Sequence, residues 1–592
     1  MESVQQLIRE TALKVINQLY ASNLGSQDLQ VQVTKPEFEG DYTLVLFPLI
    51  KKTGKQPDQL ANEIGTALLK ENPALFTAYN LIKGFLNLTI ADGYWLSVLE
   101  KYAHDTNYGI HTSNGERVMI EYSSPNTNKP LHLGHLRNNF LGWSVAAIYQ
   151  ACGYNVVKTC IVNDRGIHIC KSMIAWQLFA NGATPEITGV KGDHFVGNYY
   201  VRFNDVYKKE VEELVAKGRT KDEAEKEAPI MKAAQQMLLD WEQGKPEIMA
   251  LWKQMNEWVY SGFDTTYKRI GSDFDKTYYE SNTYILGKKT VEEGLIRHVF
   301  YQKEDGSVWI DLTADGLDEK LVQRKDGTSV YITQDIGLAQ LRYEEFKAST
   351  NIYVIGDEQN YHMKVLQLIC KKLGLSYADG IHHLSYGMVE LPTGKMKSRE
   401  GTVVDADDLL DEMEEVAKRK TEELGKVDGF SEEERKHLYR ILSLGALKYF
   451  LLRVGPKKKM IFNPEESIDF QGQTGPFIQY THARIKSILR KAAIIENNHE
   501  RTALLPLEKE LLVTIESYPM VVQQACAEQD PSHLANYLYT LAKSFNSFYT
   551  QHSVLNADTE EKKDLRIQLS SFTALVISNG MHLLGIEAPE RM

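Results

Sequence analysis

Cysteine is scarce in this sequence: the 592 residues include five, an odd number without paired spacing. A disulfide framework is therefore excluded as the basis of the fold, and a reducing, cytoplasmic setting is favoured over secretion. Neither Cys-x-x-Cys nor His-Glu-x-x-His occurs, so we expect no metal ion held by protein ligands. A Gly-x-Ser-x-Gly elbow is also missing, which argues against a hydrolase with a serine nucleophile.

Long apolar runs are absent as well. No stretch approaches the roughly 20 residues that a membrane helix requires. The first residues carry Glu2, Arg9, Glu10 and Lys14 at helical spacing instead of the apolar core of a signal peptide. We therefore expect no membrane partner. With 43% hydrophobic and 25% charged residues the composition is that of a globular protein, and the length predicts about three or four domains.

Net positive charge is lacking too, because the formal net charge is −12. This balance argues against a broadly basic nucleic-acid binder, so any contact with RNA must use local patches. One candidate is the run Lys457, Lys458 and Lys459, and another is a series that recurs at helical spacing: Arg484, Lys486, Arg490 and Lys491. For each, a solvated charged face is the commoner fate of such a run.

What the sequence does contain is a strand, a turn and a helix arranged around two histidines. Residues 117–122 have the apolar run of a buried strand, and residues 136–149 have the apolar spacing of a helix. Between them, residues 124–135 read Ser-Pro-Asn-Thr-Asn-Lys-Pro-Leu-His-Leu-Gly-His. Free N–H groups and the positive end of the helix dipole point out of such a corner, which predicts a phosphate site. Taken alone, the histidines could be two surface residues or, less often, half of a metal site.

A second segment far downstream favours the phosphate interpretation. Gly387-Met388-Val389 is followed at 394–401 by Gly-Lys-Met-Lys-Ser-Arg-Glu-Gly, a glycine-bracketed cationic loop after a strand-like stretch. Its three cations could neutralise the charge that builds on departing pyrophosphate. An isolated loop of this kind is more often a solvated basic hairpin.

Together the two segments resemble the HIGH and KMSKS signatures of class I aminoacyl-tRNA synthetases, and their flanks resemble the arginyl-tRNA synthetase family. The resemblance spans nearly the whole chain. It is carried by Glu-Tyr-Ser-Ser-Pro-Asn at 121–126, Leu-Arg-Asn at 136–138, Gly-Asp-His-Phe-Val-Gly at 192–197, Tyr-Ile-Thr-Gln-Asp-Ile at 331–336, Thr-Gly-Pro-Phe-Ile-Gln-Tyr at 474–480 and Pro-Glu-Arg-Met at 589–592.

Alternating strands and helices over residues 109–400 predict an α/β fold with a parallel sheet, and the strands are expected at 117–122, 155–162, 329–333, 351–355 and 383–390. This Rossmann-type catalytic domain carries a helical insertion at about 168–285. We expect a small α+β N-terminal domain (1–108), a connecting region that contacts the tRNA stem (401–474) and an all-α C-terminal bundle (475–592). By the resemblance, the first domain binds the tRNA elbow and the last binds the anticodon.

The resemblance implies a ligase that activates L-arginine with ATP to arginyl-adenylate and transfers it to the 3′ end of the arginine tRNA, releasing pyrophosphate and AMP. Mg²⁺ would arrive with ATP, held mainly by phosphate oxygens and water. The implied partners are tRNA, L-arginine and ATP, and we expect a cytoplasmic monomer. The resemblance also implies that activation depends on bound tRNA.

The nucleotide site implied by the resemblance consists of His132, Gly134, His135, Met388, Lys395, Lys397 and Ser398. The histidines would donate to phosphates, the glycine would let adenosine lie against the backbone, and Lys395 would meet the phosphates from the loop. KMSKS has a second lysine where this chain has Ser398. Either Lys129, upstream of the first signature, or Lys397 takes its role, and the sequence leaves both open.

Recognition of arginine calls for carboxylates and oriented acceptors around a planar cation with five donors. The residues that the resemblance places around this substrate are Glu121, Ser124, Asn126, Tyr331, Asp335 and Gln359. Spacing supports one pair independently, because Tyr331 and Asp335 would be neighbours on one turn if a helix begins there. Without the motif context, that pair would be an ordinary helix cap or surface pair.

For tRNA, the resemblance points to Asn87 in the first domain, and to Tyr480 and the chain end at Met592 in the last. Most aromatic residues at helical spacing belong to a core, and we expect this of most rings near Tyr480.

Two other functions remain open. A small-molecule adenylyltransferase of the same fold would not need the flanking modules, and a noncatalytic RNA-binding relative would lose the two signatures.

Overall fold

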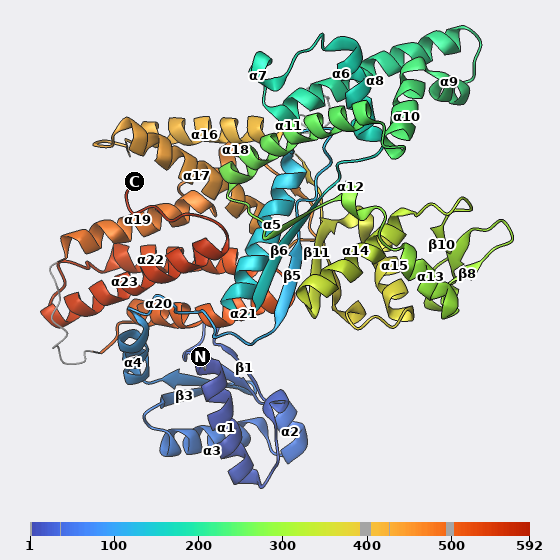
Figure 1. Ribbon diagram of the computed structural model, residues 1–592. Helices are drawn as coiled ribbons and strands as arrows, with labels where there is room; N and C mark the ends of the chain where they lie inside the picture. The colour runs from blue at the N-terminus through green and yellow to red at the C-terminus, as the bar shows by residue number, and fades with distance from the viewer. Residues whose placement is uncertain (1–2, 36, 391–403, 426, 493–502) are drawn as a thin grey trace. The chain divides into compact units, whose positions relative to one another are not determined.

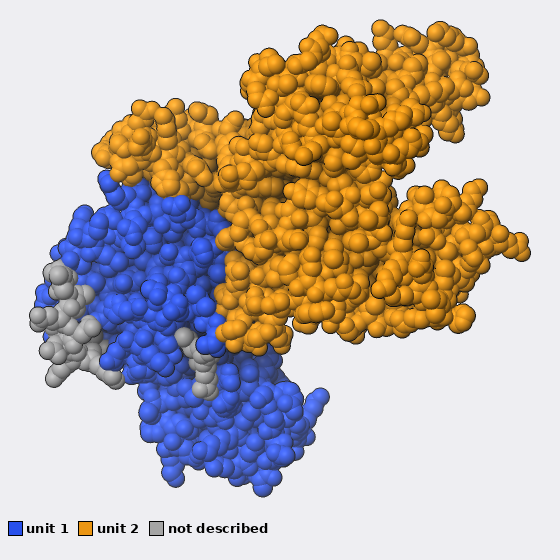
Figure 2. Space-filling view, in the orientation of Figure 1, with its two compact units in different colours: residues 1–112, 469–528, 533–592 blue, residues 113–468, 529–532 orange. Residues whose placement is uncertain are grey.

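The computed structural model describes residues 3–35, 37–390, 404–425, 427–492 and 503–592. These residues form two compact units (Figure 2). One contains residues 113–468 and 529–532, and the other contains residues 1–112, 469–528 and 533–592. Across the described ranges, no helix combines the length and the apolar composition that crossing a membrane requires.

The larger unit is built on a five-stranded sheet in the order β12-β11-β5-β6-β7 (Figure 1). The strands are β5 (Arg117–Glu121), β6 (Asn155–Val162), β7 (Lys276–Tyr279), β11 (Thr350–Gly356) and β12 (Ile381–Tyr386). All pairings are parallel, and Glu121 lies between Thr159 of β6 and Tyr353 of β11. The chain order reverses between β5 and β11, and open α/β sheets bind ligands at the carboxyl ends of strands at such a point. The predicted Rossmann-type fold is confirmed.

Helices cover both faces of this sheet because its strands are apolar on both sides. Val118, Met119 and Ile120 of β5 are each at most 1% exposed. On one face α5 (Leu133–Ala151) packs so closely that a Cβ on Gly142 would lie 2.4 Å from Cβ of Tyr122. On the other face α14 (Tyr331–Phe346) and α15 (Asn360–Lys372) share a core with Met119. This packing fixes the N-terminus of α5 at the carboxyl edge of the sheet.

Three sequence predictions about the sheet need correction. The predicted strand at 329–333 is the start of helix α14, where a β-branched and aromatic run imitates a strand although Ile332, Ile336 and Ala339 recur at helical spacing. The predicted insertion to residue 285 contains β7, which belongs to the main sheet. The strand predicted at 383–390 ends at Tyr386, and a separate β13 (Val389–Glu390) pairs with β14 (Met460–Ile461).

The insertion between β6 and β7 is helical. It consists of α6 (Ile167–Phe179), α7 (Pro185–Thr188), α8 (Gly192–Ala216), α9 (Lys221–Glu227), α10 (Pro229–Glu242) and α11 (Pro246–Ile270). Its core joins Ala175, Phe203, Ile230 and Ala234 from α6, α8 and α10. An excursion after β7, which the sequence reading did not predict, contains α12 (Glu280–Thr283), α13 (Lys288–Ile296) and an antiparallel sheet of β8 (Tyr301–Gln302), β9 (Val308–Ile310) and β10 (Lys320–Gln323).

The last part of the larger unit is a group of helices that packs against α5. It contains α16 (Ala406–Glu423), α17 (Glu432–Leu452) and α18 (Pro464–Ser467). α16 packs along α17, and both contact α5. Asp405 caps α16 by accepting from the N–H groups of Asp407 and Asp408, so this helix starts at a fixed point beside α5.

The smaller unit combines the N-terminal region with the C-terminal helices. Its sheet is antiparallel in the order β1-β2-β4-β3, formed by β1 (Gln30–Val33), β2 (Tyr42–Val45), β3 (Phe76–Ile82) and β4 (Phe85–Ile90). The helices are α1 (Val4–Tyr20), α2 (Phe47–Thr53), α3 (Pro57–Glu71), α4 (Asp92–Tyr102), α19 (Gly475–Lys491), α20 (Pro506–Glu516), α21 (Tyr518–Glu528), α22 (Ser532–Gln551) and α23 (Glu560–Leu583). The N–H of Val4 donates to Glu516 at 2.7 Å and Lys509 pairs with Asp41 at 2.8 Å, so both ends of the chain share this unit.

Candidate active site

The chain leaves β5 through a strained turn. Ser123 and Ser124 have φ values of 73° and 48°, a left-handed conformation that costs roughly 1–3 kcal/mol for each residue with a side chain. Asn138 of α5 supports the turn: Oδ1 accepts from the N–H of Ser123 at 2.5 Å, and Nδ2 donates to the carbonyl of Val354 at 2.7 Å. One amide thus joins β5, α5 and β11 at the point where the strand order reverses.

The two predicted histidines begin helix α5 and bond to its own backbone. His132 is the N-cap, and its Nδ1 accepts from the N–H of Gly134 at 3.1 Å; Nδ1 of His135 accepts from the N–H of His132 at 3.1 Å. In a neutral imidazole this arrangement leaves the proton on Nε2. Burial and nearby Lys129 lower the pKa of His132 to about 4, and burial holds the pKa of His135 well below its usual value. Both rings are therefore neutral Nε2–H donors at physiological pH.

Gly134 and Lys129 shape the same corner. A Cβ on Gly134 would lie 3.0 Å from Cε1 of His132, so a side chain there would press on the ring. Lys129 is partly exposed and pairs with no carboxylate in the described ranges. A helix N-terminus, two imidazole donors and one ammonium group form a site suited to an anion. We call residues 123–135 the histidine corner.

Three predicted loop residues, Lys395, Lys397 and Ser398, lie outside the described residues. The chain is described again from residue 404, and there it pairs with the histidine corner. The N–H of Leu133 donates to the carbonyl of Val404 at 2.9 Å, and a bridge between His132 and Asp405 continues the pairing. The segment after the loop is therefore tied directly to the start of α5.

The segment before the loop is held by a buried arginine that sequence reasoning did not assign to the site. Arg137 of α5 is 1% exposed, and its Nη2 donates to the carbonyls of Pro456 at 2.7 Å and Lys458 at 2.9 Å. The N–H of Gly387 donates to the same Pro456 carbonyl at 3.0 Å. Met388, the predicted nucleotide contact, follows directly and is 50% exposed. The helix that carries the histidines thus also positions Met388.

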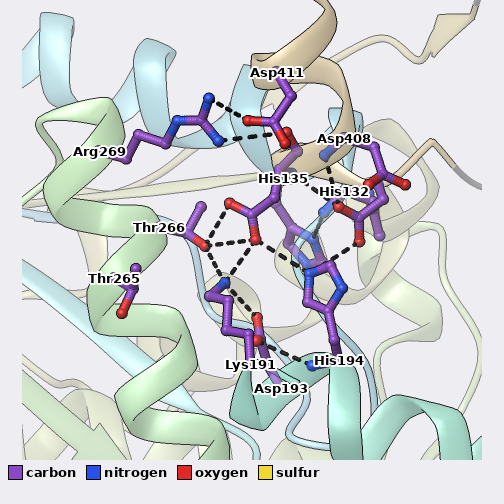
Figure 3. Close-up of polar contacts among 12 residues, drawn as sticks. His132, His135, Lys191, Asp193, His194, Thr265, Thr266, Arg269, Asp408 and Asp411 are labelled. Carbon is purple, nitrogen blue, oxygen red and sulfur yellow. Dashed lines mark hydrogen bonds and ion pairs between the residues drawn. The ribbon is translucent and has the colours of Figure 1, made fainter. Parts of the chain in front are cut away.

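A polar network beside the histidines ties the start of α8 to the start of α16 (Figure 3). Nζ of Lys191 lies 3.0 Å from Asp193 and 2.7 Å from Asp407, and Nε2 of His194 lies 3.1 Å from Asp407. Burial would raise the pKa of Asp407, but His194 and Lys191 outweigh it and hold this pKa well below its usual range. Asp193, His194 and Asp407 are of the types that bind metal ions, yet the ammonium group of Lys191 already supplies positive charge between the carboxylates.

Two of the predicted arginine-binding residues line one cavity, which we call the Asn126 cavity. It has a volume of about 630 Å³, and Asn126 and Tyr331 line it together with Glu280 and Gln334. Tyr331 is the first residue of α14 and is 74% exposed. The predicted helical turn is confirmed, because α14 places Asp335 one turn after Tyr331.

Glu280 in this cavity was missed by sequence reasoning. It is the first residue of α12, directly after β7, and therefore stands at the carboxyl edge of the sheet. Burial raises the pKa of Glu280 to about 7, against the effect of Arg165. Its carboxylate has no hydrogen-bond or ion-pair partner in the described ranges. An acidic residue just after a strand was the available signal, but β7 itself was not predicted.

Glu121 and Ser124 lie together, but Glu121 is paired inside the protein. Glu121 is 5% exposed and contacts Arg342 of α14, which is 2% exposed. Oγ of Ser124 donates to the other carboxylate oxygen at 3.3 Å. The guanidinium group of Arg342 also lies 4.9 Å from the ring of Tyr278 and 5.7 Å from that of Tyr353. An internal guanidinium therefore holds the carboxylate that the sequence assigns to the substrate.

Asp335 is paired as well. Its Oδ2 lies 2.6 Å from Nε2 of His362 on α15. This bond raises the pKa of His362 against the opposing effect of burial. Gln359 is exposed after the end of β11 and is not part of the lining of the Asn126 cavity.

The three predicted tRNA contacts differ in exposure. Asn87 is 2% exposed and accepts from Oγ1 of Thr43 at 2.6 Å, so it stabilises the N-terminal sheet from inside and offers no surface to RNA. The prediction that it contacts tRNA directly does not fit this position. Tyr480 is partly exposed with the guanidinium of Arg484 4.7 Å from its ring, and Met592 is partly exposed at the chain end.

Comparison with known proteins links these features to one family. The model of the class I (R) tRNA synthetase catalytic domain matches residues 97–463. The DALR anticodon-binding domain matches residues 478–592, and the arginyl-tRNA synthetase N-terminal domain matches residues 2–90. The arginine–tRNA ligases of Flavobacterium psychrophilum and Bacteroides thetaiotaomicron are each 54% identical to this chain, over 603 and 596 residues, with 100% of both chains covered.

Solved structures agree on the fold. Thermus thermophilus arginyl-tRNA synthetase has a TM-score of 0.79 at 23% identity, and the Plasmodium falciparum arginyl-tRNA synthetase has 0.77 at 21%, each with 100% of both chains covered. At such identities the likeness concerns the fold, whereas the catalytic-domain model and the 54% identical relatives carry the assignment. The chain therefore belongs to the arginyl-tRNA synthetase family, within class I of the aminoacyl-tRNA synthetases.

Proposed function

We propose that this enzyme activates L-arginine with ATP and transfers the arginyl group to the 3′ end of the arginine tRNA. A carboxylate oxygen of arginine attacks the α-phosphorus of ATP, the bond to the β-phosphate breaks, and pyrophosphate leaves. A ribose hydroxyl of tRNA then attacks the carbonyl carbon of the adenylate and gives up its proton, and AMP leaves. Positioning and charge stabilisation carry both steps, so no covalent enzyme intermediate is needed.

The histidine corner is our candidate for the phosphate site, and it is the observation that supports the proposal most directly. Neutral His132 and His135 offer Nε2–H donors beside the N-terminus of α5. These donors suit the charge that develops on phosphate oxygens. Lys129 adds a positive charge and is our preferred substitute for the missing KMSKS lysine, because it has no carboxylate partner in the described ranges. Lys397 is the alternative.

Other nucleotide contacts in the proposal follow from the sequence motif. Gly134 has no side chain, so adenosine can lie against the backbone of the corner. Met388 contacts adenosine from a segment that Arg137 anchors. Lys395 and Ser398 contact the phosphates from the loop. Because the loop lies outside the described residues, its part of the proposal rests on the motif alone.

We assign the substrate arginine to the Asn126 cavity. The guanidinium group of the substrate is proposed to meet Tyr331 and Glu280 of the lining, and Asp335 one turn after Tyr331, which the lining does not include. A planar cation with five donors requires carboxylates and an oriented acceptor. The groups assigned to its α-amino and carboxylate ends are Glu121, Ser124, Asn126 and Gln359. In the structure Glu121 is paired with Arg342 and Asp335 with His362, so the substrate must share or replace these partners.

Mg²⁺ is proposed to enter with ATP. The groups at the histidine corner are imidazole donors, backbone N–H groups and an ammonium group, which suit phosphate oxygens and do not bind a metal ion. A Mg²⁺ ion would therefore keep phosphate and water ligands and would neutralise the charge of the departing pyrophosphate.

The tRNA is proposed to contact Tyr480 and Met592 in the C-terminal helices, where both are partly exposed. A stacking contact by a ring such as Tyr480 contributes about 1–3 kcal/mol. We further propose that arginine activation requires bound tRNA, and that the enzyme acts as a cytoplasmic monomer.

Pyrophosphate exchange tests the proposal. Each of the standard amino acids is offered with ATP and Mg²⁺, with and without unfractionated tRNA. Exchange with arginine alone, and only when tRNA is present, is expected. Exchange without any RNA would favour a small-molecule adenylyltransferase, and tRNA binding without any exchange would favour a noncatalytic RNA-binding protein.

A further inference from the structure

The run Lys457, Lys458 and Lys459 differs from the other basic series of this acidic chain. All three side chains are exposed, and none pairs with a carboxylate in the described ranges. On α19, by contrast, Lys486 pairs with Glu590 at 2.9 Å and Arg490 donates to the carbonyl of Glu590 at 3.0 Å. The cations of α19 are thus partly neutralised by the chain end, while the lysine run keeps its full charge.

The backbone of the lysine run is fixed from inside. Nη2 of buried Arg137 donates hydrogen bonds to the carbonyls of Pro456 and Lys458, at 2.7 and 2.9 Å. Gly387 packs against the run so closely that a Cβ there would lie 2.9 Å from the carbonyl oxygen of Lys458. With its carbonyls turned toward Arg137 and β14 following at Met460, the run presents three lysine side chains from a rigid base. A rigid base lowers the entropy lost when such side chains bind.

A groove adjoins the run. It has a volume of about 450 Å³ and lies between α15, β12 and Lys457. Lys364, Asn360 and Ser385 bring side-chain donors to its lining, and Asp357 is the one carboxylate in it. Gln367 also lines the groove, but its amide donates to the carbonyl of Ile381 at 3.0 Å. Lys364 is exposed and, like the run, has no ion-pair partner in the described ranges. The groove and the run together form a surface rich in donors and positive charge.

We propose that Lys457, Lys458 and Lys459, with Lys364, bind the phosphodiester backbone of the acceptor end of tRNA. This inference rests on the proposed function, since the 3′-terminal ribose must reach the adenylate. The run directly precedes β14, whose Met460 donates its N–H to the carbonyl of Met388 at 3.1 Å. The carbonyl of Lys458 accepts from Arg137 of α5, the helix that begins at the histidine corner. The RNA that passes this surface is therefore the part nearest the 3′ end. In a chain of net charge −12, such a local patch is what phosphate contact requires.

The salt dependence of binding tests this inference. Each phosphate contact contributes about 0.7–0.9 to the slope of log K against log salt concentration. The variant Lys457→Gln/Lys458→Gln/Lys459→Gln should reduce that slope by about 2–3 and weaken binding at low salt by roughly 10-fold or more. Lys364→Gln should reduce the slope by about 1. Binding is measured by fluorescence anisotropy with two probes, labelled full-length tRNA and a labelled acceptor-stem hairpin.

A charge-matched control is available at the C-terminal end of α8, in Lys208, Lys209 and the C-cap residue Lys217. Lys208→Gln/Lys209→Gln/Lys217→Gln removes three exposed lysines of the helical insertion and the same total charge. It should leave the slope nearly unchanged. An equal loss of slope in both triple variants would mean a general field effect and would overturn the site. A loss seen with full-length tRNA but not with the hairpin would overturn the assignment to the acceptor end.

Failure of this inference can be told apart from failure of the proposed function. Wild-type enzyme that charges arginine tRNA, together with a lysine-run variant of unchanged slope, would refute only the lysine surface. Wild-type enzyme that charges no tRNA with arginine would refute the proposed function. The melting temperature and arginine binding of each variant show whether it is folded, and both should match the wild type.

Discussion

The histidine corner and the residues proposed to bind arginine hold their polar groups in different ways. At the corner, His132 and His135 bond to the backbone of their own helix and keep Nε2–H groups as neutral donors. Among the residues proposed to bind arginine, Glu121 is paired with Arg342 and Asp335 with His362. The difference teaches that the proposed phosphate site is set by local structure. The proposed arginine-binding carboxylates have partners that an incoming guanidinium would share or replace.

Removing a histidine of the histidine corner should have the largest effect on arginine activation. His135→Ala should slow arginine activation by about 10²-fold or more, because a donor fixed at the developing phosphate charge is lost. The measurement is the rate of pyrophosphate exchange at saturating arginine and tRNA. His298→Ala, at an exposed position away from the corner, is the matched control. Near-normal exchange by a folded His135→Ala enzyme would contradict the assignment.

Neutralising Asp335 should act on the other region. Asp335→Asn should raise the KM for arginine by about 10- to 100-fold, because a charge-assisted hydrogen bond contributes about 1.5–3 kcal/mol. The KM for ATP should change much less. Steady-state kinetics with each substrate varied in turn measures both. An unchanged KM for arginine would move guanidinium recognition elsewhere.

Glu280 should give the proposed arginine site a pH dependence. Burial raises the pKa of this carboxyl group to about 7, so it is protonated below that pH and ionised above it. The kcat/KM for arginine should therefore rise as the pH increases through about 7. Glu280→Gln should raise the KM for arginine by about 10-fold at pH 8 and flatten this profile. A profile of the same shape in the variant would show that another group is responsible.

Replacing His362 should have the smallest effect of the four changes, and it should lower the KM for arginine where the other substitutions at the arginine site raise it. Its pKa is raised by Asp335, so the pair is held below that pKa and released as the pH rises through it. His362→Gln frees Asp335 and should lower the KM for arginine by about two- to fivefold near pH 6, the magnitude of a partly exposed ion pair. The change should shrink as the pH rises through the raised pKa of His362. His298→Gln is the control, and a raised KM in His362→Gln would show that the imidazole supports arginine binding.

The sequence predicted the features that depend on local pattern. The strand, turn and helix of the histidine corner were predicted, and so was the helical turn that joins Tyr331 and Asp335. Residues 329–333, which include the start of α14, were also assigned to a strand, because aromatic and β-branched residues occur in both structures. Features that depend on distant residues were missed. Glu280 follows a four-residue strand, β7, that only pairing with β6 reveals.

Partners buried by the fold could not be predicted either. Nothing near Glu121 in the sequence indicates that Arg342 of α14 will reach it, and nothing near Arg137 indicates the carbonyls of Pro456 and Lys458. Asn87 shows the opposite case. A motif suggested an RNA contact, but the alternation of side chains along the strand places Asn87 against Thr43. Burial follows from the assembled sheet and is not determined by local sequence.

Titration calorimetry on three proteins tests the central claim most directly. Arginine and a nonhydrolysable ATP analogue are each titrated into the wild type, His135→Ala and Asp335→Asn. The account predicts that Asp335→Asn loses affinity for arginine but keeps that for the analogue, and that His135→Ala does the reverse. Equal losses of both ligands in both variants would contradict the division into a preformed phosphate corner and a partner-exchanging arginine site.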